Sequence, residues 1–439
     1  MIVKKFGGTS IATPKLIRHV ADMLPGSKNI LLVLSAIAGT TNTLGSIASH
    51  LYKKDKQKAS ELTTELEQYY SKFIDELFND KATRIAAAEM AGEHFSHIRS
   101  FMCDMFTRFE ECTILAQGEL ISTALFKFYC DEIGLKTALI PALDFMRIDP
   151  SGDPDLHYLS ENLGKIINNH KETDVFITQG YICRNAFGEI DNLKRGGSDY
   201  TATLIAAALN VESIEIWSDV NGMCNIDPSI VTHTRSIDAL SYTEAAELAY
   251  FGARILHPYC VQPVQEKRIP LILKNTLNPE NKGTLISANS GNKDAIKAVA
   301  AKDDIIAIKI RSGRMLQAYG FLRNLFEVFE RYQTPIDLIT TSEVAVSLTI
   351  DQPENLDNIV NELKLFGHVE VDSDQVIICI VGDFLEENHG YAAMVFNALK
   401  DIPVRMVSYG GSKNNISLLV NKEDKEKTLL ALNNNLFRL

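Results

Sequence analysis

Residues 2–10 read Ile-Val-Lys-Lys-Phe-Gly-Gly-Thr-Ser, a β-favouring run that ends in a pair of glycines and a hydroxyl pair. Thr13 then offers a helix cap, and Pro14 stands where proline is favoured in a first helical turn. A second apolar run, 30–34, follows without alternation, which is typical of a strand covered on both faces. A strand, a glycine turn, a helix and a buried strand in that order predict an α/β fold with a mostly parallel sheet.

The same pattern continues to about residue 290. Residues 52–110 are charged and helix-favouring with few glycines or prolines, so we expect helices that extend over one side of the sheet. Strands and helices alternate beyond them, which extends the predicted parallel sheet. The further strands are predicted at 137–140, 175–178, 214–217 and 270–273, and the helical stretches at 200–209 and 242–250.

The sequence beyond about residue 295 repeats itself with an offset of 70 residues. Gly320 corresponds to Gly390, and residues 346–348 (Val-Ser-Leu) correspond to 416–418 (Ile-Ser-Leu). Each copy reads strand, helix, strand, strand, helix. A repeat that keeps the order of its elements predicts two copies of a small α+β module.

Composition and charge narrow the classes of function. The chain has 439 residues, which exceeds the size that a single hydrophobic core usually supports, so two or three domains are expected. Its 44 Lys and Arg against 56 Asp and Glu give a formal net charge of -12 without a basic block, so nucleic acid is not an expected partner. No apolar run reaches the length of a membrane span and the first residues lack a signal-peptide core, so we expect no membrane association and a cytoplasmic location. The seven scattered cysteines lack C-x-x-C spacing, so neither disulfides nor a metal site is expected.

Loops rich in glycine or hydroxyl groups follow the predicted strands, where open α/β sheets bind their ligands. In the first, Gly7 and Gly8 let the backbone N–H groups approach an anion, and Lys5 adds a positive charge. The alternative is a tight turn with a solvated lysine. The second loop, 35–42, offers hydroxyls and an amide before a helix, or else serves as a helix cap. Neither has the Gly-Lys-Ser/Thr ending of a Walker A loop.

The third loop, 194–202, reads Lys-Arg-Gly-Gly-Ser-Asp-Tyr-Thr-Ala and is the most informative. Arg195 can clamp a carboxylate or phosphate with two parallel hydrogen bonds, and Asp199 can hold a nearby lysine. The alternative is a capped surface helix. Beyond this loop, Asp219 can contact an adenine or ribose, and Arg254 brings another cation to a helix terminus. Phosphoryl transfer requires little more than such positioning and neutralisation of charge.

Five motifs, taken in order, resemble the signature of the aspartate kinases. They are 5–10 (Lys-Phe-Gly-Gly-Thr-Ser), 35–42, 117–122 (Gln-Gly-Glu-Leu-Ile-Ser), 195–202 and 252–258 (Gly-Ala-Arg-Ile-Leu-His-Pro). The resemblance runs nearly the whole length of the chain and includes a C-terminal pair of α+β, ferredoxin-like ACT modules, which match the repeat. It implies an amino-acid kinase fold, a mostly parallel sheet sandwiched by helices, at 1–292, with ACT modules at 293–375 and 376–439.

The resemblance implies that the chain transfers the γ-phosphoryl group of ATP, with Mg²⁺, to the β-carboxylate of L-aspartate. The product, 4-phospho-L-aspartate, would enter lysine, threonine and methionine synthesis. No covalent enzyme intermediate is implied, and the assembly would be a homodimer or a dimer of dimers. The chain ends soon after the second module, so a monofunctional enzyme without a fused homoserine dehydrogenase is expected. The alternatives are another enzyme of this fold, such as a glutamate, acetylglutamate or uridylate kinase, and a catalytically silent amino-acid sensor.

The same resemblance assigns roles to individual residues. Lys5 would stabilise charge on the transferred phosphate, and Asp199 would orient the cations around it. Arg195 would pair the α-carboxylate of aspartate, and Glu119 its ammonium group. The full sets are Lys5, Asp199 and Arg254 for catalysis; Lys5, Gly7, Gly8, Ser35, Ser218, Asp219 and Arg254 for ATP; and Thr41, Glu119, Arg195 and Ser198 for aspartate.

An effector site is implied in the first ACT module, at positions that bind lysine in lysine-inhibited relatives. They are Met315, Asp337, Thr341, Ser342 and Glu343. Feedback inhibition by lysine is the hypothesis, because two carboxylates suit a cationic effector. Sensitivity to threonine, or to neither, is the alternative, because Ala318 and Tyr319 alter the neighbouring loop.

Four positions depart from the family's pattern. Cys224 stands in place of tyrosine, Ser229 of arginine, Arg254 of lysine and Lys194 of glycine. Arg254 keeps the charge with a different geometry, whereas Cys224 and Ser229 remove an aromatic wall and a cation. The nucleotide side of the expected site therefore matches the family least well.

Overall fold

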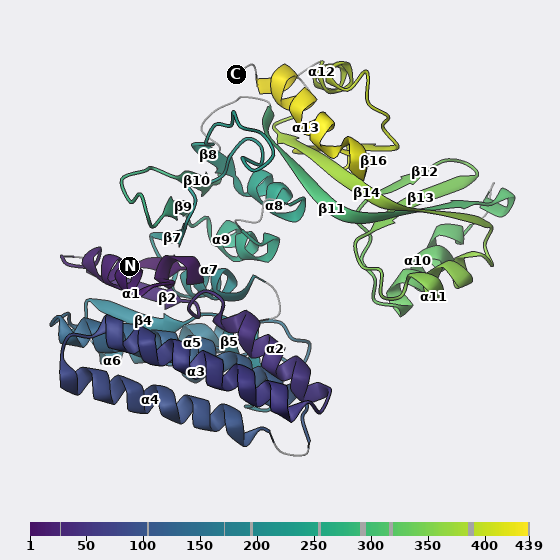
Figure 1. The fold of residues 1–439 in the computed structure, drawn as a ribbon. Helices are drawn as coiled ribbons and strands as arrows, with labels where there is room; N and C mark the ends of the chain where they lie inside the picture. Colours follow the sequence, from purple (N-terminus) through teal and green to yellow (C-terminus); the bar gives the residue numbers. More distant parts are fainter. Residues whose placement is uncertain are drawn as a thin grey trace. The chain divides into compact units, whose positions relative to one another are not determined.

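The computed structural model describes residues 1–26, 28–102, 105–170, 172–193, 196–252, 256–289, 296–315, 319–384 and 390–437 (Figure 1). The chain divides into two compact units. One consists of Met1–Met223, Asp238–Tyr242 and Leu256–Ser290, and the other of Cys224–Ile237, Thr243–Ile255 and Gly291–Leu439. Within the described ranges, no helix combines the length and the apolar character that a bilayer span requires.

The first unit is built on an eight-stranded sheet in the order β3-β4-β2-β1-β7-β9-β10-β8. All neighbouring strands in it are parallel except β9 and β10, which confirms the predicted mostly parallel sheet. The strands are β1 (Ile2–Phe6), β2 (Ile30–Leu34), β3 (Thr137–Leu139), β4 (Val175–Gln179), β7 (Ser213–Ser218), β8 (Ala239–Ser241), β9 (Leu271–Asn275) and β10 (Thr284–Ser287). A separate hairpin is formed by β5 (Ile182–Arg184) and β6 (Ile190–Asn192).

Helices cover both faces of this sheet. Phe6, Leu32 and Trp217 point into one core together with residues of the first five helices. Side chains alternate along a strand, so Lys5 points to the opposite face, where α7 packs on β1 and β2. The helices of this unit are α1 (Pro14–Asp22), α2 (Thr40–Tyr52), α3 (Lys56–Leu77), α4 (Lys81–Ser100), α5 (Arg108–Glu132), α6 (Leu156–Asn169), α7 (Gly197–Leu209) and α9 (Val261–Lys267), with the short helix η1 (Gly8–Ile11).

Local sequence explains where three of these helices begin. Thr13 caps α1 by accepting a hydrogen bond from the N–H of Leu16, and Pro14 opens the helix as predicted. A capping box between Thr107 and Glu110 starts α5. The residue before α7 is Gly196 with φ of 72°, a left-handed conformation that favours glycine.

The second unit contains a six-stranded antiparallel sheet in the order β12-β13-β11-β14-β16-β15. Its central strands are long: β11 (Ile296–Arg311) and β14 (His368–Gly382). The others are β12 (Ile339–Thr341), β13 (Ala345–Ile350), β15 (Met406–Tyr409) and β16 (Asn415–Asn421). The helices are α8 (Tyr242–Tyr250), α10 (Phe321–Arg331), α11 (Leu356–Leu363), α12 (Tyr391–Ala398) and α13 (Lys425–Leu432), with the short helix η4 (Gly313–Met315).

The internal repeat is confirmed by the order of these elements. One copy runs β11, α10, β12, β13, α11 and the other runs β14, α12, β15, β16, α13. Gly320 and Gly390 take the same place, before α10 and α12, with φ of 80° and 96°. The two copies have separate cores, one around Leu325 and the other around Val395.

The two modules share their central strands, which the sequence did not predict. Ile296 and Val299, in the first half of β11, belong to the core of the second module although β11 is the strand that opens the first module in the chain. Ile306 and Ile308, in the other half of β11, belong to the core of the first. Each module supplies three strands to its own part of the sheet. Half of the other module's long strand, β11 or β14, adds a fourth.

Candidate active site

The expected phosphate loops meet at one edge of the parallel sheet. Phe6 is in register with Leu34 on β2 and with Trp217 on β7, and Leu34 is in register with Gln179 on β4. The residues that follow these four therefore form one row: Gly7, Ser35, Gly180 and Ser218. With adjacent strands about 4.8 Å apart, the row spans roughly 14 Å. It lies at the carboxyl ends of the strands, where open α/β sheets bind ligands.

Lys5 is held at this edge by an ion pair with Asp199. Its Nζ lies 2.5 Å from the Oδ1 of Asp199, and the two side chains are 11% and 18% exposed. One residue comes from β1 and the other from the first turn of α7, nearly 200 residues later in the chain. The expectation that Asp199 holds a nearby lysine is thereby confirmed. The ion pair holds the Lys5 ammonium at the sheet edge, where a cation forms strong charge-assisted hydrogen bonds to an anion.

The glycine pair has two different functions in the structure. The N–H of Gly7 donates to the carbonyl of Trp217 (3.2 Å), so this amide is used by the sheet and not by a ligand. A Cβ on Gly8 would lie 2.7 Å from the carbonyl oxygen of Ala36, closer than real Cβ atoms come. Gly8 therefore allows the first and second loops to pack side by side.

Glu119 is a buried carboxylate next to the second loop. It lies on α5 and is 3% exposed. Its Oε1 accepts a hydrogen bond from the N–H of Ala36 (3.3 Å), while its buried Oε2 has no partner among the described residues. Burial raises the pKa of Glu119 to about 8. A cationic group of a ligand would relieve the cost of ionising this carboxylate.

Two neighbours of Glu119 fix the second loop. Ser122 donates through Oγ to the carbonyl of Ser35 (2.8 Å). A Cβ on Gly118 would lie 2.9 Å from the Cβ of Ala36, so the glycine lets α5 approach the loop closely. The Gln-Gly-Glu-Leu-Ile-Ser motif is thus a helix surface shaped to hold the loop that contains Ser35.

The start of α7 packs tightly on the end of β4. A Cβ on Gly180 would lie 2.3 Å from the Oγ of Ser198, so glycine is required for this contact. Ser198 is buried. The structure therefore brings Lys5, Ser35, Glu119, Ser198 and Asp199 to one edge of the sheet.

Sequence reasoning missed Tyr181, which follows Gly180. Its φ of 67° is left-handed, which is uncommon for an aromatic residue and costs about 1–3 kcal/mol. The strained backbone is held at both sides, because its N–H donates to the Oγ1 of Thr201 (2.8 Å) and its carbonyl accepts from the N–H of Leu193 (2.8 Å). Burial, and then the negative charge of Glu119, raises the pKa of Tyr181. A Gly-Tyr pair directly after a buried strand was the available signal.

The structure describes some of the other residues that are expected to bind ligands and not the rest. Ser218 ends β7, where its carbonyl accepts from the N–H of Thr276 (2.8 Å), and Asp219 follows it on the exposed turn. Thr41 is exposed in the first turn of α2. Arg195 and Arg254 lie outside the described residues, as does Lys194.

Two departures from the family's pattern lie in the second unit. Ser229 donates through its N–H (2.8 Å) and its Oγ (2.7 Å) to the Oδ1 of Asp227, so it caps a turn. Cys224 is partly buried, and burial raises the pKa of its thiol. A neutral thiol and a turn-capping serine do not supply the cation or the aromatic ring expected at these positions.

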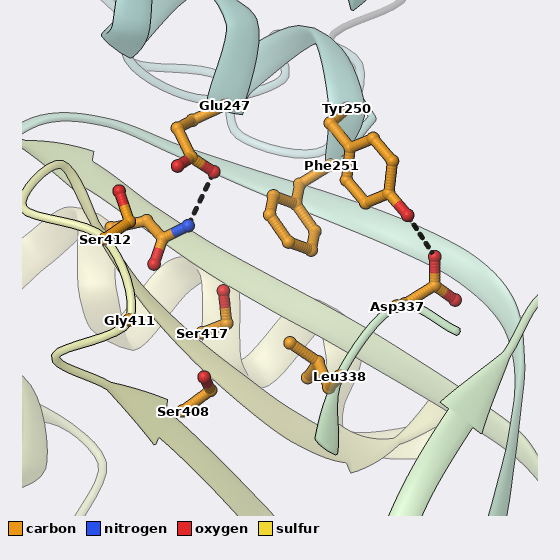
Figure 2. A pocket seen from close by; sticks show the side chains of 10 residues that line it. Glu247, Tyr250, Phe251, Asp337, Leu338, Ser408, Gly411, Ser412 and Ser417 are labelled. Carbon is orange, nitrogen blue, oxygen red and sulfur yellow. Dashed lines mark hydrogen bonds between the residues drawn. The ribbon is translucent and has the colours of Figure 1, made fainter. Parts of the chain in front are cut away.

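The expected effector residues differ sharply in exposure. Asp337 has a side chain only 1% exposed, and its Oδ1 accepts from the Nζ of Lys302 (2.6 Å) and the hydroxyl of Tyr250 (2.9 Å; Figure 2). Thr341 ends β12, and Ser342 and Glu343 form the exposed turn before β13. Met315 ends η4 and packs partly buried against the core of the first module. The Asp337 carboxylate is therefore already paired with a cation of the chain itself.

Comparisons with known proteins match this architecture. The model of the amino acid kinase family matches residues 1–275, and that of the ACT domain matches 378–436. Lysine-sensitive aspartokinase 3 of Escherichia coli is 31% identical, over 100% of this chain and 99% of that protein. The chain belongs to the aspartokinase family. Another aspartokinase, the chloroplastic aspartokinase 1 of Arabidopsis thaliana, is 31% identical over 99% of this chain and 80% of its own.

Solved aspartokinase structures confirm the predicted fold class. The E. coli aspartokinase III structure in complex with aspartate and ADP has a TM-score of 0.85 and 30% identity, with 100% of both chains covered. The structure of the same enzyme with lysine and aspartate has a TM-score of 0.78 and 30% identity, covering 100% of this chain and 99% of that one. The amino-acid kinase fold followed by ACT modules is therefore the fold of this family member.

Proposed function

We propose that this aspartokinase transfers the γ-phosphoryl group of ATP to the β-carboxylate of L-aspartate, giving 4-phospho-L-aspartate. The observation that carries the proposal is the placement of a lysine and a buried carboxyl group at one sheet edge. Lys5 is a cation held in place by Asp199, and Glu119 is a buried carboxyl group whose Oε2 has no partner among the described residues. A nucleotide phosphate suits the first group, and the ammonium of an acidic amino acid suits the second.

The phosphate side of the site fits ATP. Lys5 is held by Asp199, and Gly8 removes the side chain that would separate the first two loops. Bound ATP supplies the phosphoryl group and a leaving group. Mg²⁺ is held mostly by substrate phosphates and water, so it requires no cage of side chains. Among the described residues, no group of three His, Cys, Asp or Glu forms such a cage.

The acceptor side of the site fits aspartate. Glu119 would bind the ammonium group, and Ser198 and Thr41 would donate or accept hydrogen bonds. Arg195, two residues before the start of α7, is assigned to the α-carboxylate. This arrangement leaves the β-carboxylate directed at the phosphate, where it acts as the nucleophile itself.

The chain's own residues then act by position and charge. Lys5 stabilises the negative charge that develops on the transferred group, and its ion pair with Asp199 keeps it in place before substrate arrives. No side chain needs to form a covalent bond in this mechanism.

An ADP-release assay with alternative acceptors tests the proposal. We expect ADP release with L-aspartate and little with L-glutamate, N-acetyl-L-glutamate or UMP. Release with one of the other acceptors in place of aspartate would make the chain a different kinase of this fold. Release with none of them, by a protein that binds an amino acid, would make it a sensor.

Regulation by lysine, or alternatively by threonine, is part of the proposal. Its support is that one matching relative is named lysine-sensitive and that one matching structure contains lysine. The residues assigned to the effector are Met315, Asp337, Thr341, Ser342 and Glu343. Loss of activity in millimolar lysine, relieved in Glu343→Gln, would support this assignment, and an unchanged rate would contradict it.

Assembly, location and exact module limits also remain proposals. A homodimer or dimer of dimers is expected, and sedimentation velocity at two protein concentrations distinguishes them. A cytoplasmic location is tested by cell fractionation. The limits 1–292, 293–375 and 376–439 are kept as approximate, since β14 extends across the last of them.

A further inference from the structure

A hydrogen bond between two buried hydroxyl groups joins the second loop to α3. The Oγ1 of Thr40 lies 2.9 Å from the hydroxyl oxygen of Tyr70, and either group can donate. Thr40 is 2% exposed and Tyr70 is 0% exposed. Neither the motifs nor the family resemblance assigns a role to Tyr70, and the proposed phosphoryl transfer does not use it.

An aromatic cluster from two helices fixes the position of the Tyr70 hydroxyl. α3 packs against α2 on one side and against α4 on another (Figure 1). The ring of Tyr70 contacts the ring of Phe73 on the same helix (centroids 6.5 Å apart) and that of Phe95 on α4 (5.7 Å). All three belong to the core of the first unit, and burial raises the pKa of Tyr70, so its hydroxyl keeps its proton. The second loop therefore meets a hydroxyl group in a fixed place.

Thr40 makes contacts with both branches of its side chain. Its Oγ1 meets Tyr70, and its methyl group packs towards α5, because a Cβ on Gly118 would lie 3.3 Å from the Cγ2 of Thr40. A β-branched side chain that is held at both branches keeps a single rotamer. The backbone N–H of Thr40 donates to the carbonyl of Ile37 (3.0 Å). Thr40 is thus a buried and well-anchored first residue of α2.

The segment just before Thr40 contributes little to holding this helix start. Gly39 has φ of 85°, and within the described residues no side chain caps α2 there. A Cβ on Gly39 would meet no described atom within 4 Å. Glycine also has more accessible backbone conformations than other residues. The position of the helix start therefore depends mainly on Thr40 and its partners.

The Thr40–Tyr70 pair adjoins both sides of the proposed acceptor site along the chain. Thr41, the next residue, is exposed in the first turn of α2 and belongs to the set assigned to aspartate. Gly118, on which the Thr40 methyl packs, directly precedes Glu119, the carboxyl group assigned to the substrate ammonium. A shift of Thr40 would therefore change the spacing between Thr41 and Glu119.

We propose that Tyr70 is a positioning residue for the acceptor side of the site. Its hydroxyl holds Thr40, and Thr40 sets where α2 begins relative to α5, so that Thr41 and Glu119 keep the spacing that aspartate requires. Tyr70 itself does not touch the substrate. The inference deepens the proposed function and rests on it, since the function defines which substrate occupies this side.

Tyr70→Phe tests the inference directly, because it keeps the ring in the core and removes only the hydroxyl. The Oγ1 of Thr40 then stays buried without this partner, which is costly, so the loop should shift towards another one. We expect KM for aspartate to rise about three- to tenfold, with kcat and KM for ATP within about twofold of wild type. Thr40→Val removes the other partner and should reproduce this pattern. Steady-state kinetics of the full-length enzyme measure all three constants.

Tyr69→Phe is the matched control, the same chemical change at the neighbouring residue of α3. Tyr69 is exposed, and its hydroxyl lies 3.4 Å from the carbonyl oxygen of Ala12, so KM for aspartate should stay near the wild-type value. Combining Tyr70→Phe with Thr40→Val leaves neither hydroxyl of the pair buried and unpaired. The double variant should therefore regain most of the affinity that each single change loses.

Hydrogen exchange tests the positioning without turnover, since the amides of residues 37–43 should exchange faster in Tyr70→Phe than in Tyr69→Phe. Equal exchange in the two variants would overturn the inference. Equal KM values for aspartate, or a rise in KM for ATP as large as that for aspartate, would do the same. Wild-type protein that releases no ADP with aspartate would instead refute the proposed function, and the exchange measurement would still decide the role of Tyr70.

Discussion

Replacing Glu119 by glutamine tests the acceptor side of the proposed site most directly. Burial moves the pKa of this carboxyl from an ordinary 4.5 to about 8. At about 1.4 kcal/mol for each pKa unit, ionising Glu119 in the empty site costs about 5 kcal/mol more than ionising an exposed glutamate. Near neutral pH the carboxyl is therefore mostly protonated, and the ammonium group of a bound aspartate would have to drive its ionisation.

Two measurable effects follow for the wild-type protein. Binding of aspartate near pH 7 should release about one proton, because Glu119 loses its proton when the substrate ammonium arrives. In addition, the folded chain holds this proton more tightly than the unfolded chain does. The contribution of Glu119 to the free energy of unfolding therefore falls as pH rises from about 4.5 to about 8.

Glu119→Gln should abolish both effects, since glutamine resembles the protonated acid but cannot ionise. Calorimetric titration with aspartate in buffers of different ionisation enthalpy measures the released proton. The loss of a charge-assisted bond should also raise KM for aspartate by about 10- to 100-fold. Proton release that persists in Glu119→Gln, together with an unchanged KM, would refute the assignment of Glu119 to the substrate ammonium.

The remaining predictions concern the phosphate loops and the strained tyrosine. Lys5→Ala should lower kcat by roughly 100-fold or more with folding intact. The control is Lys4→Ala, which should leave kcat near normal because Lys4 pairs with a different carboxylate. Equal effects of the two substitutions would remove Lys5 from the mechanism. Gly8→Ala should lower the melting temperature and the activity, because its Cβ would collide with the second loop. The control is Gly45→Ala in α2, where a Cβ meets open space, and it should stabilise the folded protein by about 1 kcal/mol. A Gly8→Ala protein as stable as Gly45→Ala would show that the loops can separate. Tyr181→Gly relieves a left-handed backbone but also removes a partly buried ring, so we expect it to lower the free energy of unfolding and to increase KM for aspartate. A variant with normal kinetics would mean that the strain serves folding alone.

Local signals explain why much of the first unit could be predicted from sequence. Residues 30–34 are continuously apolar and β2 has those bounds, and the capped start at Thr13 and Pro14 begins α1. Short elements at the rim were missed, such as β8 and β10, because three or four residues carry too little periodicity. The repeat was visible because equivalent glycines before α10 and α12 need the same left-handed backbone.

The site was less predictable because its energetics depend on distant parts of the chain. Asp199 was expected to hold a lysine, but only the packing of α7 on β1 shows that the lysine is Lys5. Glu119 was assigned from a motif, and its altered pKa depends on burial that no motif reports. The pairing of Asp337 with Lys302 and Tyr250 joins three distant segments, so the sequence alone presented that carboxylate as available.

The shared strands of the ACT modules have a consequence for biosynthesis of the chain. Residues 296–302 leave the ribosome before the strand they pair with, 377–382, which is made only about 80 residues later. Until then, Ile296 and Val299 have no core to enter. The two modules should therefore fold together in a late cooperative step, and a ribosome stalled between them would expose an apolar strand edge to chaperones and to neighbouring chains.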